Sequence, residues 1–243
     1  MRAIEKSHEP RSLAQYRVKN REYDGPNFTP IKVEIRTYLL AEQGYLCAYC
    51  MKRISTDSMK IEHWACQHDH PELELSYKNM LGCCMGNEGK PKNLQTCDTR
   101  KGSDCIKFNP SEPNHHVNDL IKFHGDGKIY STDSEFNIQL VKVLNLNSDR
   151  LVRNRTLLID SIRKELNAKK GKRTKSEIKK LIAVYLEVDT DGKLKEYYAL
   201  PLITFQQKFR KLIIQQIIHN SDSLEFYYVF SYSLEPQHFI LTC

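Results

Sequence analysis

The sequence predicts an α+β fold whose C-terminal region is mainly helical, and three features support this prediction. Apolar residues recur at helical spacing over residues 31–43 and again after Ser148. Between these two stretches, Glu62 and His63 lie in a short apolar frame that is typical of a strand end. With 243 residues, the chain can bury a hydrophobic core in one or two domains.

The N-terminal part of the chain divides into an arm and a helix. Residues 1–30 are polar and contain three prolines, so we predict an extended arm with a short helix near residues 13–17. Residues 31–43 follow as a helix, because their apolar side chains can share one face. Gly44 stands where the C-terminal cap of that helix is expected.

Cysteine spacing predicts a zinc site after this helix. Cys47 and Cys50 are separated by two residues, and a tight turn of this length points both sulfurs toward one tetrahedral zinc ion. Cys97 is the third expected ligand, and either Cys84 or Cys83 is the fourth. The alternatives are a redox-active pair or a set of reduced thiols buried in the core.

A loop separates the last two expected zinc ligands. Residues 85–96 contain two glycines and a proline, which favour turns over regular structure. Without this segment, the later cysteines would form a second closely spaced pair. The zinc knuckle is therefore expected to hold an insertion.

A hairpin followed by a long helix is predicted in the C-terminal half of the chain. Residues 122–136 alternate apolar and polar side chains around two glycines, which indicates a hairpin. A helix is expected to start after Asn147 or Ser148. Its apolar face would contain Leu151, Leu158, Ile159 and Ile162, and its other faces would contain Arg150, Arg153 and Arg155.

Helical patterns continue toward the C-terminus. Residues 176–188 and 201–220 are predicted helices, and residues 224–234 are aromatic and β-prone, which predicts a strand. The apolar face of the second helix, which contains Phe209 and Leu212, is expected to fill the core of the chain. The alternative is that this face docks on a partner protein.

Four polar residues near the cysteines could support metal-assisted hydrolysis of a phosphodiester bond. This reaction needs a base, a cation, and a group that holds the base in place. His63 is the candidate base, because the unperturbed pKa of histidine lies near neutrality. Glu62 and Asp98 offer hard oxygen ligands that suit magnesium or manganese. Asn79 could fix the imidazole through its amide or touch the substrate.

Each of these residues taken alone is more often structural, and only their combination favours chemistry. A lone histidine usually makes a structural hydrogen bond, and a lone asparagine usually lies in a turn. Adjacent residues of a strand also point to opposite faces. A twisted or bulged strand end could still bring Glu62 and His63 to one metal-centred site.

Residues 47–102 resemble the HNH endonuclease family, whose ββα-metal unit is often embedded in a zinc knuckle. Glu62 and His63 are similar to the acid–histidine step of that family, and Asn79 is similar to its asparagine. Asp98 stands where the family has its last metal ligand. The departures are glutamate at position 62, aspartate at position 98 and the long loop between Cys84 and Cys97. The two acids keep oxygen ligation. The resemblance implies a nuclease core within residues 31–110 that uses magnesium or manganese and releases 5′-phosphate ends.

A narrower resemblance covers residues 1 to about 155. Short motifs along this stretch are similar to the HNH nuclease subunit of Septu-type anti-phage systems, which is also found beside some retrons. The motifs lie at residues 1–6, 39–47, 61–64, 86–89, 97–102 and 144–147. In that family the nuclease works with an ATPase of the ABC/SMC-like type, so the resemblance implies such a partner. Residues 1–30 could contact this partner, and residues 111–243 are the expected accessory and docking region.

Composition allows an anionic partner and gives no sign of a membrane segment. The formal net charge is +7 and the basic residues cluster in residues 163–180, which could form a solvated face or a patch that follows phosphates. Arg100 and Lys101 are the predicted direct phosphate contacts, because they lie next to Asp98. No stretch approaches the roughly 20 apolar residues that span a bilayer. We also find no apolar signal segment, so a cytoplasmic location with reduced thiols is expected.

Together these features predict a metal-dependent endonuclease that cuts nucleic acid, with DNA as the favoured substrate. The resemblance to Septu-type nuclease subunits implies that it acts as the effector of an anti-phage complex with an ATPase. One alternative is a zinc-dependent nucleic-acid-binding module whose catalytic residues no longer act. The other is a subunit that mainly regulates the ATPase and does not need His63.

Overall fold

The computed structural model describes residues 1–201, apart from residues 21, 170 and 172. The described residues all belong to one compact unit, Met1–Thr204. The predicted helix over residues 201–220, beyond its first residue, therefore lies outside the described residues. The predicted strand over residues 224–234 lies outside them as well.

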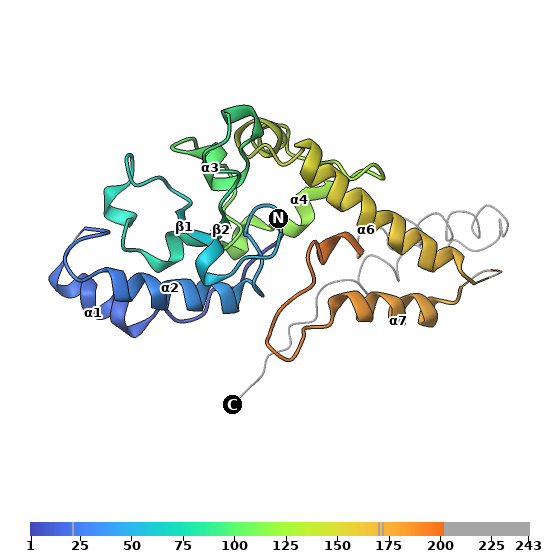
Figure 1. Ribbon diagram of the computed structural model, residues 1–243, viewed down its shortest axis with the longest axis horizontal. Helices are drawn as coiled ribbons and strands as arrows, with labels where there is room; N and C mark the ends of the chain where they lie inside the picture. Colours follow the sequence, from blue (N-terminus) through green and yellow to red (C-terminus); the bar gives the residue numbers. More distant parts are fainter. Residues whose placement is uncertain (21, 170, 172, 202–243) are drawn as a thin grey trace. The chain divides into compact units, whose positions relative to one another are not determined.

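Two N-terminal helices pack beneath the first hairpin of the molecule (Figure 1). Helix α1 spans Arg11–Lys19 and helix α2 spans Thr29–Glu42, so both predicted helices are confirmed. Gly44 has a φ of +58°, a left-handed conformation that favours glycine and ends α2 as expected. The residues before α1 are not helical, and the backbone N–H of Ile4 donates to the carbonyl of Pro110 at 2.8 Å. The arm is therefore attached to the core.

An antiparallel hairpin followed by a short helix forms the centre of the fold. Strand β1 spans Met59–His63, strand β2 spans Met80–Cys84, and helix α3 spans Cys97–Lys101. In the register of the hairpin, His63 lies opposite Met80. This β-β-α order is the order that the HNH resemblance implies. Short 3₁₀ turns occur at Thr56–Ser58, Pro71–Leu73, Tyr77–Asn79, Lys92–Leu94 and Pro113–His115.

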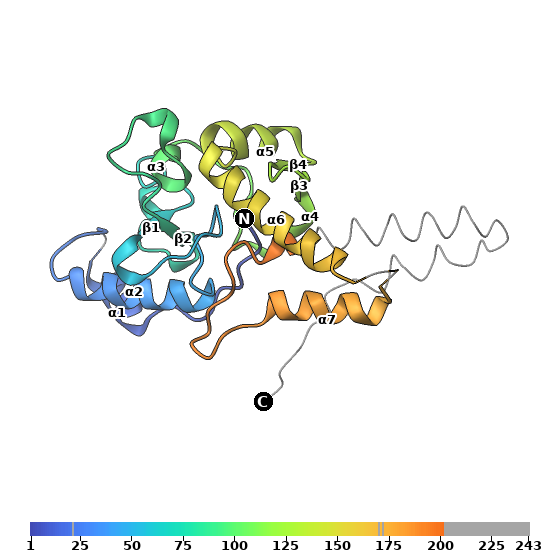
Figure 2. The ribbon, with the colours of Figure 1, turned by 45° about the vertical axis from the view of Figure 1, so that its right-hand side comes forward.

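A second hairpin lies beside α6, as Figure 2 shows. Strands β3 (Ile121–Phe123) and β4 (Ile129–Ser131) pair antiparallel, which confirms the hairpin expected around the glycines. Helix α4, at Val117–Leu120, precedes β3. Helix α5, at Ser134–Ile138, follows β4 and continues into a π-helical turn at Gln139–Val143.

Two longer helices follow the second hairpin. Helix α6 spans Asp149–Asn167 and helix α7 spans Lys175–Leu186, as predicted from their periodicity. Arg155 corrects one expectation, because it is buried and does not lie on an outer face of α6. Its guanidinium donates to the carbonyl of Leu146 at 2.7 Å and to the carbonyl of Gly127 at 2.5 Å. These bonds tie α6 to the second hairpin, a long-range role that helical periodicity does not reveal.

One apolar core connects these elements. Leu39 of α2, Leu81 of β2, Phe136 of α5 and Leu151 of α6 are all buried in it. The structure thus has mixed helices and small sheets, which confirms the α+β prediction. Within the described part of the chain, no helix combines the length and the apolar character needed to cross a membrane.

Candidate metal centres and active site

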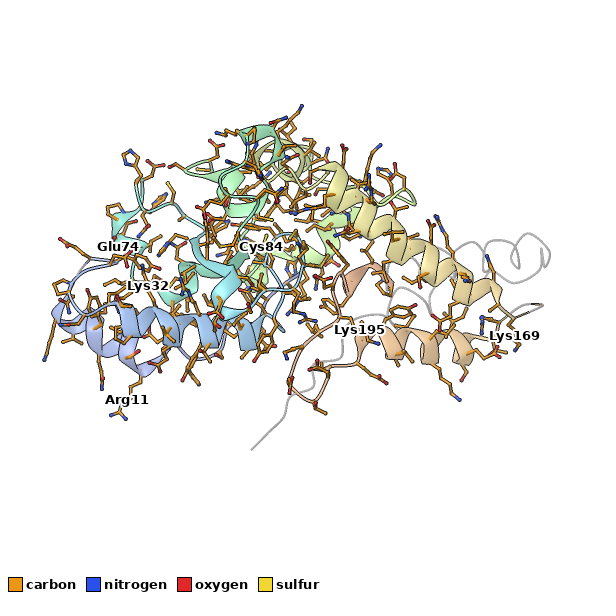
Figure 3. All side chains as sticks on the ribbon, in the orientation of Figure 1. Arg11, Lys32, Glu74, Cys84, Lys169 and Lys195 are labelled. Carbon is orange, nitrogen blue, oxygen red and sulfur yellow. The ribbon has the colours of Figure 1, made fainter. Side chains whose placement is uncertain are left out.

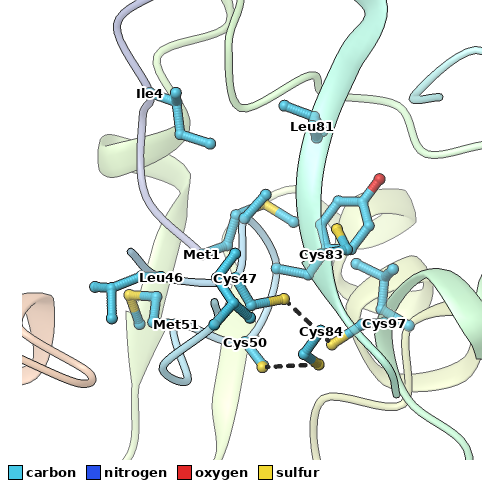
Figure 4. Close-up of a cluster of buried hydrophobic side chains, with 14 of the residues drawn as sticks. Met1, Ile4, Leu46, Cys47, Cys50, Met51, Leu81, Cys83, Cys84 and Cys97 are labelled. Carbon is cyan, nitrogen blue, oxygen red and sulfur yellow. Dashed lines mark hydrogen bonds between the residues drawn. The ribbon is translucent and has the colours of Figure 1, made fainter. Parts of the chain in front are cut away.

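Four cysteine sulfurs meet beside the first hairpin (Figure 4). The sulfurs of Cys47 and Cys97 are 3.9 Å apart, those of Cys50 and Cys84 are 3.8 Å apart, and all four lie within 4.8 Å of one another. A tetrahedron with Zn–S bonds of about 2.3 Å has edges of about 3.8 Å. The cluster therefore has the dimensions and donor chemistry of a structural zinc site.

The fold brings these cysteines together from three places in the sequence. Cys47 and Cys50 lie in the turn after α2, where Met51 has a φ of +62° and the N–H of Met51 donates to the carbonyl of Cys47. Cys84 is the last residue of β2 and Cys97 is the first residue of α3. The four-sulfur group contains Cys84 rather than Cys83, which decides the alternative that spacing left open. Figure 3 labels Cys84 among the crowded side chains near the centre of the view.

The motif at residues 144–147 supports the zinc knuckle and the loop inserted into it. The carbonyl of Leu144 accepts a hydrogen bond from the N–H of Cys97 at 2.9 Å. The side-chain amide of Asn145 donates to the carbonyls of Asn93 and Gln95, both within the inserted loop. The motif thus fixes the loop against the start of α3.

Burial and mutual hydrogen bonding shift the pKa values of the clustered cysteines in different directions. Burial alone would raise the pKa of Cys47, but hydrogen bonds from the neighbouring cysteines lower it well below its usual value. The pKa values of Cys50 and Cys97 are raised well above the usual value, and the largest cause in each case is the hydrogen bond to Cys47. The cluster therefore favours at least one thiolate, the form that binds zinc.

A pair of carboxylates, Glu62 and Asp98, forms a second candidate centre. Glu62 of β1 is buried, and its Oε1 accepts hydrogen bonds from the hydroxyl of Tyr49 at 2.9 Å and from the ammonium of Lys101 at 2.8 Å. Burial, followed by hydrogen bonding with Asp98 and the charge of Asp98, raises the pKa of Glu62 well above its usual value. The structure thus places the two predicted oxygen ligands next to each other.

Asp98 connects this acid pair to solvent. It follows Cys97 in α3, and its side chain is 19% exposed. The ammonium of Lys60 lies 4.0 Å from its Oδ2. Because one carboxylate is buried and the other is accessible, the pair can accept a divalent cation from solvent. Its hard oxygen donors suit magnesium or manganese.

The ring of His63 is held from two sides at the end of β1. Its Nε2 lies 2.8 Å from the carbonyl oxygen of Glu74. A carbonyl can only accept, so Nε2 carries the proton, and Nδ1 of the neutral ring keeps its lone pair. The ring of Tyr23 packs edge-on against the imidazole, with the centroids 4.8 Å apart.

Burial is the main influence on the protonation of His63. It lowers the pKa of the imidazole, and the charge of Lys101 acts in the same direction. The hydrogen bond to Glu74 opposes this effect without cancelling it. The ring is therefore poised in the neutral form, which is the form that can accept a proton.

Asn79 holds the loop between the two strands of the hairpin. Its Oδ1 accepts from the N–H of Ala65 at 2.8 Å, and its Nδ2 donates to the carbonyls of Ala65 at 2.9 Å and Leu73 at 3.3 Å. Its amide thus contacts the backbone instead of the imidazole, which corrects the contact predicted from sequence. The physical reason is that one side-chain amide matches both hydrogen-bonding groups of a backbone segment. Since Leu73 precedes Glu74, Asn79 supports His63 indirectly.

Glu62 and His63 face different neighbours, as the alternation of a strand requires. The side chain of Glu62 contacts Tyr49 and Lys101, whereas the ring of His63 contacts Tyr23 and the Glu74 carbonyl. Lys101 links the two positions, because it also donates to the backbone carbonyl of His63 at 3.2 Å.

One of the two predicted phosphate contacts, Lys101, does not lie as expected. The side chain of Lys101 is 0% exposed, so it cannot reach a phosphate in this conformation. Arg100 donates to the carbonyls of Lys92 and Lys142, which ties α3 to its surroundings. The structure shows Lys60 at the accessible edge of the acid pair instead. Its position two residues before Glu62 was the available signal, because alternate strand residues share a face.

No family model matches the chain. The chain is 27% identical over 159 residues to a curated protein of Vibrio cholerae serotype O1 biovar El Tor, named "Retron Vc95 putative HNH endonuclease". The alignment covers 63% of this chain and 76% of that protein. This similarity confirms the resemblance to HNH endonucleases, including those associated with retrons, that the motifs had indicated.

Proposed function

We propose that the chain is an HNH endonuclease that hydrolyses phosphodiester bonds of nucleic acid, with DNA as its substrate. The observation that carries this proposal is the arrangement of three side chains on the β-β-α centre. Asp98 of α3 lies against Glu62 of β1, and Lys101 links Glu62 to the backbone of His63, whose neutral ring keeps a lone pair on Nδ1. The similarity to a named HNH endonuclease supports the same conclusion.

His63 is the proposed general base. Its Nε2 is occupied by the Glu74 carbonyl, so Nδ1 would take the proton from the attacking water. The bond to Glu74 fixes the tautomer and also stabilises the imidazolium that forms. Asn79 acts one step further away, because it holds the loop that supplies this carbonyl.

Glu62 and Asp98 are the proposed ligands of a catalytic magnesium or manganese ion. When bound, such an ion would neutralise charge on the phosphate and on the leaving 3′ oxygen. The protein contributes the fixed position of Glu62, which Tyr49 and Lys101 hold through hydrogen bonds. Release of a 5′-phosphate end is the product that the HNH resemblance implies.

The cysteine cluster is the proposed site of a structural zinc ion. Four buried sulfur donors leave no position for substrate, which is typical of structural rather than catalytic zinc. Because Cys97 and Asp98 are adjacent in α3, zinc binding would also set the position of Asp98.

An ATPase of the ABC/SMC-like type is the proposed partner, within a cytoplasmic anti-phage complex. This proposal rests on the motifs that resemble the Septu-type nuclease subunit. Residues 1–30 and 111–243 remain the proposed contact regions.

A cleavage assay with matched histidine variants tests the proposed activity. Wild type, His63→Ala and His70→Ala would be compared on plasmid and single-stranded DNA with magnesium, alone and with the co-expressed ATPase. His70 is a suitable control because it lies at the surface of the loop between β1 and β2. We expect the cleavage rate of His63→Ala to fall by a factor of about 10²–10⁴ and that of His70→Ala to stay at the wild-type value.

Two outcomes would contradict the proposal. Normal cutting by a folded His63→Ala protein would remove His63 from the mechanism. DNA binding by wild type without any cutting, even with the ATPase and either metal, would favour the nucleic-acid-binding alternative.

A further inference from the structure

A lysine without solvent contact lies inside the candidate active site. The side chain of Lys101 is 0% exposed, and its ammonium lies 2.8 Å from Oε1 of Glu62 and 3.2 Å from the carbonyl of His63. Burying an ammonium is costly unless it is paired and hydrogen-bonded. The position of this charge is therefore specified by the acid pair and by the end of β1.

Lys101 acts on the acid pair from the same helix as Asp98. The two residues are three positions apart in α3, so they share one face of the helix. That face presents both a carboxylate and an ammonium to Glu62. When both carboxylates are ionised, as metal binding requires, the fixed ammonium reduces the net charge from −2 to −1, which weakens their attraction for a divalent cation.

We propose that Lys101 is a positioning residue that serves as a fixed internal cation, holding Glu62 and the backbone of His63 while weakening divalent metal binding to the acid pair. The inference rests on the proposed nuclease function. Its consequence is that the acid pair retains a metal ion weakly until a phosphate of the substrate adds negative charge. Metal retention and substrate binding are then coupled.

Lys60 provides a matched control with the same charge in a different environment. Its ammonium lies 4.0 Å from Asp98, and it also pairs with Glu88 at 2.6 Å. Its side chain is 25% exposed, so solvent screens its effect on the acid pair more strongly. Removal of either lysine deletes one positive charge, but only Lys101 is enclosed.

Manganese binding to the full-length, zinc-loaded protein tests the inference directly. Free Mn²⁺ would be followed by electron paramagnetic resonance during titration of wild type, Lys101→Met and Lys60→Met. Asp98→Asn would identify the binding that belongs to the acid pair. We expect Lys101→Met to bind Mn²⁺ at least about tenfold more tightly, because a like charge has been removed from a low-dielectric site. Lys60→Met should change the affinity by less than about threefold.

Cleavage on the same samples separates positioning from charge alone. Lys101→Met should cut more slowly than wild type despite its tighter metal binding, since Glu62 and the His63 backbone lose their link to α3. If Lys101→Met does not fold, Lys101→Gln replaces it, because glutamine is neutral and can still donate to the His63 carbonyl. The same tightening is expected in that variant.

Several results would overturn the inference. A folded Lys101 variant with unchanged or weaker Mn²⁺ affinity would do so, as would failure of both variants to fold, which would assign Lys101 a purely structural role. Wild-type cleavage that needs no divalent metal would instead refute the proposed catalytic mechanism. If wild type cleaves normally and needs a divalent metal, but the Lys101 variant binds Mn²⁺ with unchanged affinity, only the inference is refuted.

Discussion

The cysteine cluster and the acid–histidine centre, which consists of Glu62, Asp98 and His63, are built from the same structural elements. They differ in whether a position for a further ligand is left open. Helix α3 supplies Cys97 to the first and Asp98 to the second, although these residues are adjacent. The cluster has four sulfur donors, all within 4.8 Å of one another, and a tetrahedral zinc ion bound to them would have no open position. The acid–histidine centre has two oxygen donors, one of them accessible, and a histidine that can accept a proton.

This difference separates the expected consequences of damage at the two centres. Loss of a donor from a closed site removes a metal that supports folding. Loss of a donor from an open site removes chemistry and leaves the fold intact. Because Cys97 and Asp98 are neighbours, the dependence should run in one direction. Damage to the cluster should disable the acid–histidine centre, but the reverse should not occur.

The largest effect is expected for Cys50→Ser. Removal of one of four zinc ligands should cost more than about 4 kcal/mol and lower the yield of folded protein, because loss of a structural metal is among the most damaging single changes. Zinc content and thermal melting would measure this. Cys83→Ser is the control, since Cys83 is buried next to Cys84 but is not part of the four-sulfur group. Zinc loss from Cys83→Ser with retention in Cys84→Ser would contradict the ligand set.

Asp98→Asn should break the other centre alone. We expect cleavage to fall by about 10² or more, since one of two oxygen ligands loses its charge. Zinc content and the melting temperature should stay close to those of wild type. If this substitution releases zinc, the two centres are not separable in the way that their geometry indicates.

Asn79→Ala should give an intermediate effect on both stability and rate. It deletes three hydrogen bonds to the loop backbone, which should cost about 1–3 kcal/mol of unfolding free energy. Cleavage should slow by roughly tenfold as the Glu74 carbonyl loses its fixed position. Melting curves and single-turnover rates would measure the two effects. A total loss of cutting at unchanged stability would indicate direct contact of Asn79 with substrate or imidazole.

The smallest effect is expected for Arg100→Ala. Its guanidinium already donates to two backbone carbonyls, so it can add at most a partial phosphate contact. Loss of one phosphate contact lowers the slope of log affinity against log salt by about one. Binding of DNA at several salt concentrations would test this. An unchanged slope would mean that Arg100 only supports α3.

Local patterns predicted the elements and most of the four-cysteine cluster. Helical periodicity identified α2, α6 and α7, and the spacing of Cys47 and Cys50 indicated zinc. The choice between Cys84 and Cys83 could not be made, because adjacent strand residues point to opposite faces and the sequence does not reveal which face meets the turn. In the structure, Cys84 is the last residue of β2 and its sulfur lies in the four-sulfur group.

Long-range pairings are what the sequence could not reveal. Lys101 was assigned to phosphate because it stands beside Asp98, yet its partner Glu62 lies on another element. Asn79 was expected to fix the imidazole or to touch the substrate, and its amide binds the backbone of Ala65, fourteen residues earlier. In both cases the partner depends on how α3 and the loop pack on β1, which no local pattern describes.

The most direct test of the two-centre account follows zinc and cleavage in the same sample. The full-length protein, with its ATPase if they form a complex, would be treated briefly with a chelator and desalted, and then assayed with and without added magnesium or manganese. We predict about one zinc per chain before and after treatment, loss of cleavage, and recovery on addition of either ion. Cleavage that persists without added metal, or that returns only with zinc, would contradict the account.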